Sequence, residues 1–200
     1  MNPNVYKRPN KPRFVSVKQR DDFAPIAKAE PIEIIAVDKA TECHVTPDDV
    51  ADRMVGYLGP TGDYLTLEPS AGTGQLTKAL LRSGHSQFEI TQIERHIKLA
   101  AGLHKFGPVI NRCFLEYASE ANGKVEFPRV IMNPPFREVR KHIAAALSLM
   151  GRNGHECAPC LVALVPVTFE HSGAELLEVL SPDTFATAKV NTKIIRIVKG

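Results

Sequence analysis

The 200-residue sequence holds no tryptophan, and aromatic residues make up only 6% of it. Its four cysteines are too few and too scattered for a disulfide framework, which predicts a reducing compartment. No apolar run reaches the roughly 18 residues that a membrane-spanning helix needs, and the N-terminus lacks the apolar stretch of a signal peptide. The sequence therefore predicts a soluble, cytoplasmic protein without a membrane partner.

Acidic residues are missing from residues 1–20, which hold six lysines and arginines. Since the whole chain has a net charge of +3, residues 21–200 carry −3. This composition predicts a flexible, basic arm over residues 1–31 that is suited to phosphate contacts, and a solubilising tail is the alternative. Residues 32–200 are long enough for one globular domain, and we expect no separate target-recognition domain.

Short β-rich runs alternate with helical patterns through most of the remaining chain. The runs expected as strands are 64–68, 88–94, 109–115, 125–132 and 160–167, and 32–37 is expected as a short strand or a packed extended segment. The segments expected as helices are 46–58, 74–84, 95–107 and 137–151. Such alternation is typical of an α/β fold with a mostly parallel sheet that helices cover on both faces.

The two ends of the domain carry their own signals. Thr46 is the expected N-cap of the first helix, and Pro47 fits its first helical position. Near the C-terminus, 174–180 reads as a short helix, whereas 184–190 and 191–199 read as strands that are joined almost directly. Strands connected so closely must be antiparallel, so we expect a hairpin at this end of the sheet.

The stretch LEPSAGTGQL lies where the first strand of the alternating series turns into a helix. Gly72 and Gly74 allow a tight turn and close approach of a ligand, but Thr77 replaces the third glycine of a dinucleotide fingerprint and no P-loop ending follows. Glu68 puts a carboxylate at the strand tip, which suits an amine-bearing ligand. Glu94 ends the next strand, from which a carboxylate can bind a ribose diol.

The segment RVIMNPPF, residues 129–136, ends a buried-strand pattern with an amide, two prolines and an aromatic ring. Two prolines remove backbone donors and stiffen the loop, and an ordinary strand exit is the structural alternative. In such a loop the Asn133 side-chain oxygen and the Pro134 carbonyl can accept the two hydrogens of a target amine. Phe136 offers a face on which a flipped base stacks.

With the acidic glycine motif EPSAGTG and NPPF about sixty residues later, the chain resembles the S-adenosylmethionine-dependent amino-methyltransferases of the NPPY/NPPF type, similar to N6-adenine DNA methyltransferases. The resemblance covers about residues 44–199, because HVTP resembles the "TP" segment that precedes the glycine motif in these enzymes. It implies a Rossmann-like, seven-stranded, mostly parallel sheet with a C-terminal antiparallel hairpin. It also implies S-adenosylmethionine as cofactor and transfer of its methyl group to an exocyclic amine.

Adenine N6 in DNA is the first substrate that this resemblance implies. RNA adenine, a protein glutamine, or an inactive cofactor-binding or nucleic-acid-binding module are the alternatives. The partner is therefore expected to be nucleic acid, with DNA ahead of RNA and with a separate specificity protein as an option.

The resemblance also assigns roles to individual positions. The implied catalytic residues are those of the NPPF motif, Asn133, Pro134, Pro135 and Phe136. The implied cofactor-binding residues are Thr46, Pro47, Glu68, Ser70, Gly72, Gly74, Glu94, Cys113 and Phe114. Cys113 departs from the family, which usually has an acid there that reaches the adenine amine, so weaker cofactor binding or an inactive homologue follows as an alternative. No metal site is expected, because His155, Cys157 and Cys160 have no second pair of ligands at zinc spacing.

Overall fold

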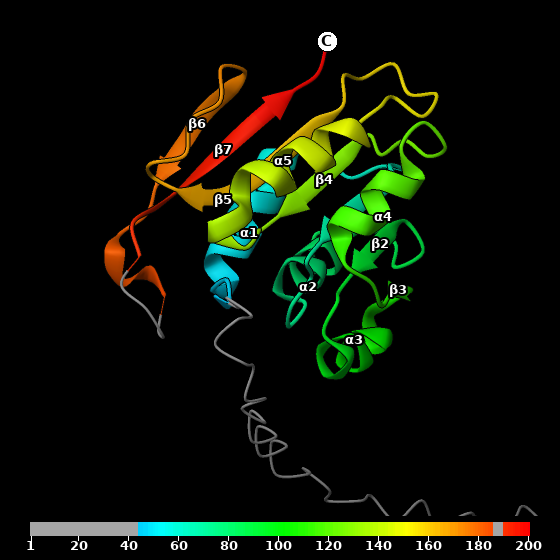
Figure 1. Ribbon diagram of the computed structural model, residues 1–200, viewed down its shortest axis with the longest axis horizontal. Coiled ribbons are helices and arrows are strands. Elements are labelled where there is room, and N and C mark those ends of the chain that lie inside the picture. The colour runs from blue at the N-terminus through cyan, green and yellow to red at the C-terminus, as the bar shows by residue number, and fades with distance from the viewer. Residues whose placement is uncertain (1–43, 186–189) are drawn as a thin grey trace, which may run out of the picture. The chain divides into compact units, whose positions relative to one another are not determined.

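The computed structural model describes residues 44–185 and 190–200 of the chain. The expectations for the 1–31 arm and for a strand at 32–37 lie outside these residues. The described strands form one seven-stranded sheet in the order β3-β2-β1-β4-β5-β7-β6 (Figure 1). These strands are β1 Thr66–Pro69, β2 Ile90–Ile93, β3 Val109–Ile110, β4 Arg129–Met132, β5 Cys160–Pro166, β6 Ala174–Val179 and β7 Thr192–Val198.

Strands β1 to β5 run parallel, whereas β7 is antiparallel to both β5 and β6. The α-helices are α1 Asp48–Leu58, α2 Gln75–Arg82, α3 Ile97–Leu103, α4 Phe114–Ala121 and α5 Val139–Ser148. Short 3-10 turns are η1 His104–Phe106, η2 Phe136–Glu138 and η3 Pro182–Thr184. No helix in the described ranges is both long and apolar enough to cross a membrane.

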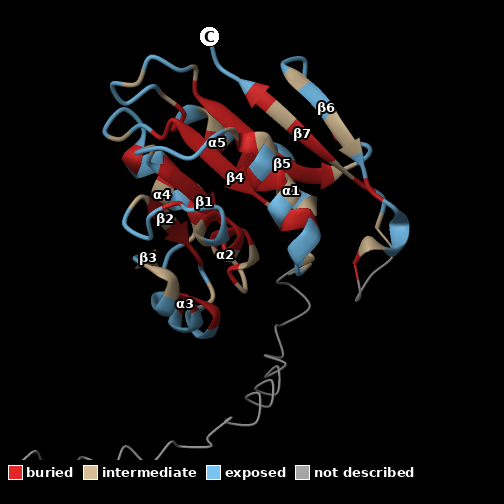
Figure 2. Ribbon diagram, turned by 180° about the vertical axis from the view of Figure 1, so that it is seen from behind, coloured by how far each residue is buried: buried red, intermediate tan, exposed pale blue. Residues whose placement is uncertain are grey.

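Alternating side chains of the central strands build two hydrophobic cores, one on each face of the sheet. On β4, Val130 and Met132 pack with α4 and α5, whereas Ile131 between them packs with α1 and α2. Successive residues of a strand point to opposite faces, so a continuously apolar strand serves both cores at once. Figure 2 shows the central strands buried and the edge strand β6 more exposed. The predicted α/β fold with helices on both faces and an antiparallel C-terminal pair is confirmed.

The direction in which successive strands are added to the sheet reverses between β1 and β4. Strands β2 and β3 extend the sheet on one side of β1, while β4 and β5 extend it on the other. Loops that leave the carboxyl ends of β1 and β4 therefore turn apart and leave a crevice between them. The glycine loop follows β1 and the NPPF segment follows β4, so the fold brings both motifs to this crevice.

One helix was missed in the sequence prediction. The expected strand at 109–115 ends at Ile110, and α4 occupies part of the expected polar loop. Phe114, Ala118 and Ala121 recur with helical spacing and are buried against the sheet. The aromatic, β-rich start of this segment masked its helical period.

The predicted helix at 174–180 is wrong, because this segment forms β6. Its residues are good helix formers, but β7 presents an open edge of backbone donors and acceptors that β6 pairs with, through a register shift between Leu176 and Glu178. Arg196 and Glu175 add a cross-strand ion pair at 2.7 Å. Besides β5, the antiparallel neighbour of β7 is therefore β6. Part of the expected strand at 184–190 lies outside the described residues.

Thr46 does not cap α1. The helix begins at Asp48 with Pro47 in the N-cap position and without a side-chain cap. The Thr46 hydroxyl instead accepts a hydrogen bond from Asn133. Its position is therefore set by the NPPF loop rather than by the helix that follows it.

Candidate active site

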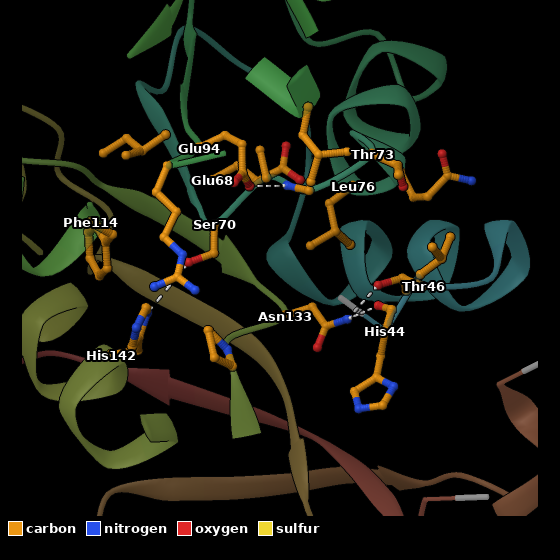
Figure 3. A pocket seen from close by; sticks show the side chains of 18 of the residues that line it. His44, Thr46, Glu68, Ser70, Thr73, Leu76, Glu94, Phe114, Asn133 and His142 are labelled. Carbon is orange, nitrogen blue, oxygen red and sulfur yellow. Dashed lines mark hydrogen bonds between the residues drawn. The ribbon is translucent and has the colours of Figure 1, made fainter. Parts of the chain in front are cut away.

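A cavity of about 230 Å³ lies at the carboxyl ends of β1, β2 and β4. Most of the residues that the sequence assigns to a cofactor or substrate line it together (Figure 3). They are Thr46, Glu68, Ser70, Gly72, Glu94, Cys113, Phe114, Asn133 and Pro135. The other four assigned residues, Pro47, Gly74, Pro134 and Phe136, lie outside its lining.

The glycine loop adopts left-handed backbone conformations at three positions, Ser70 (φ 61°), Gly72 (φ 57°) and Gly74 (φ 77°). A non-glycine residue in this region is uncommon, and such strain gathers at binding and catalytic sites. A Cβ atom at Gly74 would meet Leu103 Cδ2 at 2.6 Å. Gly74 therefore lets α2 begin close to α3, whereas Gly72 lines the cavity.

Glu94 joins the glycine loop to the start of α3. Its Oε2 accepts a hydrogen bond from the backbone N–H of Gly72 at 2.8 Å, and its Oε1 accepts one from the N–H of His96 at 2.7 Å. Each carboxylate oxygen keeps a further lone pair. The residue assigned to a ribose diol is thus also a support for the loop that would bind the ligand.

Glu68 is only 1% exposed, and Thr77 donates a hydrogen bond to its Oε2. The same Thr77 hydroxyl lies 3.1 Å from Gln92 Oε1, whose amide nitrogen is committed to the Pro108 carbonyl at 3.3 Å. One hydroxyl hydrogen cannot serve two acceptors at once, and a protonated Glu68 that instead donates to the Thr77 oxygen would leave the Thr77 hydrogen for Gln92. Burial raises the pKa of Glu68 to about 8, which agrees with a neutral carboxyl at pH 7.

The side chain of Asn133 is fixed by the segment that precedes α1. Its Nδ2 donates to the His44 carbonyl at 2.8 Å and to the Thr46 hydroxyl at 3.0 Å. Both amide hydrogens are thereby used, and no hydrogen bond within the described chain uses the Oδ1 atom. The amide therefore presents an acceptor at the cavity.

Phe136 stacks on the ring of His44, with 5.1 Å between centroids and 24° between planes. His44 lines the cavity and also lies against Phe185, 5.9 Å away and tilted by 59°. One face of the Phe136 ring is therefore covered by a histidine. A base that stacks on Phe136 must use its other face or take the place of His44.

His142, on α5, lines the cavity but was assigned no role from the sequence. It shares one face of α5 with Val139, Ile143 and Ala146, and all four are buried. This i, i+3, i+4, i+7 spacing was the available signal, because a histidine within an apolar helical stripe points inward.

Arginines stand at the same cavity. Arg95, Arg112 and Arg137 all line it, and Arg112 is tied to Glu120 by two hydrogen bonds of 2.7 and 2.8 Å. Guanidinium groups at the cavity favour an anionic substrate.

The histidine and cysteines near the start of β5 lie apart from this cavity. The His155 ring packs on Tyr64 at 4.6 Å, and the Tyr64 hydroxyl donates to Cys157 Sγ at 3.5 Å. Among the described residues, no three His, Cys, Asp or Glu side chains are placed to hold a metal ion.

Comparison with known proteins gives structural matches only. No protein-family model and no curated protein matches the sequence. The 23S rRNA methyltransferase ErmE superposes with a TM-score of 0.59 at 16% identity, over 79% of this chain and 70% of its own. A putative RNA methyltransferase from Pyrococcus horikoshii gives 0.58 at 18% identity, over 80% and 87%. A type I restriction-modification methyltransferase subunit from Streptococcus thermophilus gives 0.63 at 14% identity, over 80% of this chain and 47% of its own.

At these identities the matches define the fold rather than the activity. The chain has the Rossmann-like methyltransferase fold, with the seven-stranded sheet and the antiparallel C-terminal strands that the sequence predicted.

Proposed function

We propose that the protein is an S-adenosylmethionine-dependent methyltransferase that acts on an exocyclic amine, with adenine N6 in DNA as the first candidate. The orientation of Asn133 carries this proposal. Because its amide nitrogen is held by His44 and Thr46, its oxygen remains as an acceptor at the cavity. An acceptor at this place, beside a rigid diproline loop, suits a substrate that brings N–H donors.

The residues of the cavity fit the proposed cofactor. Glu68 offers a carboxyl to an amino group, and Glu94 keeps lone pairs for ribose hydroxyls while it holds the loop. Phe114 and Leu76 provide apolar surface at the same cavity. S-adenosylmethionine, when bound, supplies a sulfonium methyl group that an amine nitrogen can attack.

The NPPF residues would activate the amine. Its lone pair is delocalised into the aromatic ring, so attack requires the nitrogen to become more tetrahedral. A hydrogen bond to the Asn133 oxygen favours that change, and it comes from a residue that lines the cavity. In this proposal the Pro134 carbonyl, which lies outside the cavity lining, is the second acceptor. No strong base is required, because the proton can leave to water after the methyl group has moved.

RNA adenine and protein glutamine are the competing substrates. The name of one structural neighbour refers to 23S rRNA, and that of another refers to a restriction-modification system. RNA adenine and protein glutamine each carry an amino group that could be methylated. The arginines at the cavity favour a nucleic acid over a neutral protein loop. An inactive module is the other alternative, and the cysteine at position 113 is the observation in its favour.

A labelled-methyl transfer assay tests the proposal. The full chain is incubated with S-adenosylmethionine and with duplex DNA, structured RNA or protein extract, and Asn133→Ala serves as the inactive control. Label in DNA that is released as N6-methyladenine supports the first candidate. Label in protein alone excludes a nucleic-acid substrate, and no transfer despite cofactor binding supports the inactive module.

A further inference from the structure

The resemblance would place the adenine end of the proposed cofactor beside Cys113 and Phe114. The resemblance implies that Cys113 stands where an acid would accept a hydrogen bond from the adenine amine, and Phe114 directly after it starts α4 and lines the cavity. A thiol is a weak acceptor. An amine that loses water without gaining a partner weakens binding, so an acceptor near Phe114 would raise the affinity for adenine.

His142 lies at that place. Its side chain is 5% exposed, and its ring lies 5.6 Å from the Phe114 ring at an angle of 41°. Figure 3 shows both rings on one side of the cavity, with Thr46 and His44 on the other side and Asn133 between them. A ligand that spans the cavity from Thr46 to Phe114 therefore ends beside His142.

Ser70 is a hydrogen-bond partner of the imidazole. His142 Nδ1 lies 3.5 Å from the Ser70 hydroxyl oxygen, and Ser70 belongs to the glycine loop after β1. If Nδ1 carries the hydrogen and donates it to Ser70, Nε2 is left with a free lone pair. The second ring nitrogen then offers an acceptor to a ligand.

The surroundings keep this histidine neutral. Burial lowers the pKa of His142, the nearby cations Arg95 and Lys141 lower it further, and the carboxylate of Glu138 opposes them. A neutral imidazole has one donor and one acceptor, whereas the charged form has two donors and could not accept from an amine.

We propose that His142 Nε2 accepts a hydrogen bond from the exocyclic amine of the cofactor's adenine, in place of the acid that is missing at Cys113. His142 is then a specificity-determining residue for the adenine base of the cofactor. This inference rests on the proposed use of S-adenosylmethionine. A histidine that merely fills space behind Phe114 would leave base discrimination unchanged.

The test is calorimetric binding of two ligands to the full chain, so it does not depend on methyl transfer. The ligands are S-adenosylhomocysteine and its analogue in which purine, without the amine, replaces adenine. The wild type is expected to prefer the adenine form by on the order of tenfold, because a buried hydrogen bond distinguishes the two. His142→Phe keeps a ring beside Phe114 and is expected to abolish the preference.

Two further variants separate recognition from packing. In the His142→Phe background, Cys113→Asp supplies an acid and is expected to restore the preference for adenine. His104→Phe replaces an exposed histidine outside the cavity and is expected to bind as the wild type does. Thermal unfolding of each variant checks that it is folded. His142→Gln retains an acceptor at this position and is expected to keep part of the preference for adenine.

The outcomes are distinct. Equal loss of affinity for both ligands in His142→Phe, or no preference in the wild type, overturns the inference while the proposed cofactor stands. Failure of the wild type to bind S-adenosylhomocysteine overturns the proposed cofactor and the inference together.

Discussion

The side-chain nitrogen of Asn133 lies 3.0 Å from the hydroxyl oxygen of Thr46, although 87 residues separate the two in the sequence. This hydrogen bond joins the NPPF loop to the segment that precedes α1. It also fixes the direction of the amide, because the nitrogen is held whereas no hydrogen bond among the described residues uses the oxygen. The acceptor that the proposed reaction needs is therefore set by a long-range contact.

We expect Asn133→Ala to lower turnover by on the order of 100-fold or more while cofactor affinity changes little, since the lost acceptor acts on the target amine. Single-turnover methyl transfer and calorimetry with S-adenosylhomocysteine measure the two effects separately. Thr46→Val should cause a smaller loss, because the His44 carbonyl still holds the amide. Asn122→Ala, an exposed position, is the matched control. Unchanged turnover in Asn133→Ala would show that Asn133 only caps the strand.

Glu68 makes stability depend on pH in a defined direction. Its pKa in the folded chain is about 8, above the ordinary value of 4.5, so folding favours the protonated carboxyl. The stabilisation is complete below about pH 4.5 and is lost as the pH rises through 8. The melting temperature of Glu68→Gln minus that of the wild type should therefore increase from pH 5 to pH 9.

The quantity to measure for Glu68 is the difference in melting temperature between the variant and the wild type at each pH, because other titrating groups cancel in it. Glu116→Gln replaces an exposed carboxyl and should give a flat difference. A flat difference for Glu68→Gln as well would show that Glu68 is ionised in the folded chain.

Gly74→Ala should destabilise the fold without a matching loss of cofactor affinity. The added Cβ would lie 2.6 Å from Leu103 Cδ2 at a φ of +77°, which together cost about 2 kcal/mol of unfolding free energy. Chemical denaturation measures this cost. Gly56→Ala is the control, since nothing lies within 4 Å of its added Cβ and alanine favours a helix interior by about 0.5–1 kcal/mol. A specific loss of affinity in stable Gly74→Ala would place Gly74 at the ligand.

Glu94→Ala should lower both stability and cofactor affinity. It leaves the backbone N–H groups of Gly72 and His96 without their acceptor and removes a carboxylate from the cavity. Hydrogen bonds to charged groups contribute roughly 1.5–3 kcal/mol each, so a loss of about 3 kcal/mol in unfolding free energy is expected. Glu116→Ala is the exposed control. Normal affinity in a destabilised variant would restrict Glu94 to its structural role.

We expect the basic segment 1–20 to supply non-specific attraction to a polyanion. Each phosphate that it neutralises adds about 0.9 to the slope of log affinity against log salt for duplex DNA, so removal of its six cations should flatten the slope by at most about 5. A salt titration compares the full chain, a deletion of residues 2–20 and a variant with glutamine at the six positions. Cofactor affinity should not change. Identical slopes would place DNA binding on the rest of the chain.

Local sequence was sufficient to predict an element or a motif where the apolar pattern was long or the residues were chemically specific. The α1 helix showed a continuous apolar stripe, and the central strands showed apolar runs between turn residues. The glycine loop and the NPPF loop carry residues that ordinary turns do not need. The alternating pattern places both loops at the same edge of the sheet, since parallel strands send their carboxyl ends there, and the adjacency of β1 and β4 brings them together.

Tertiary structure decided the short elements and the orientation of side chains. β6 is a strand because the open edge of β7 pairs with it, despite helix-forming residues. α4 was hidden because its first residues favour a strand in isolation. The sequence by itself determined the fold class and the set of motifs at the cavity. Only packing between distant segments decided that the Asn133 nitrogen is held, that Phe136 lies against His44 and that His142 lines the cavity. Hydrogen-bond direction and ring contacts depend on neighbours that no local pattern specifies.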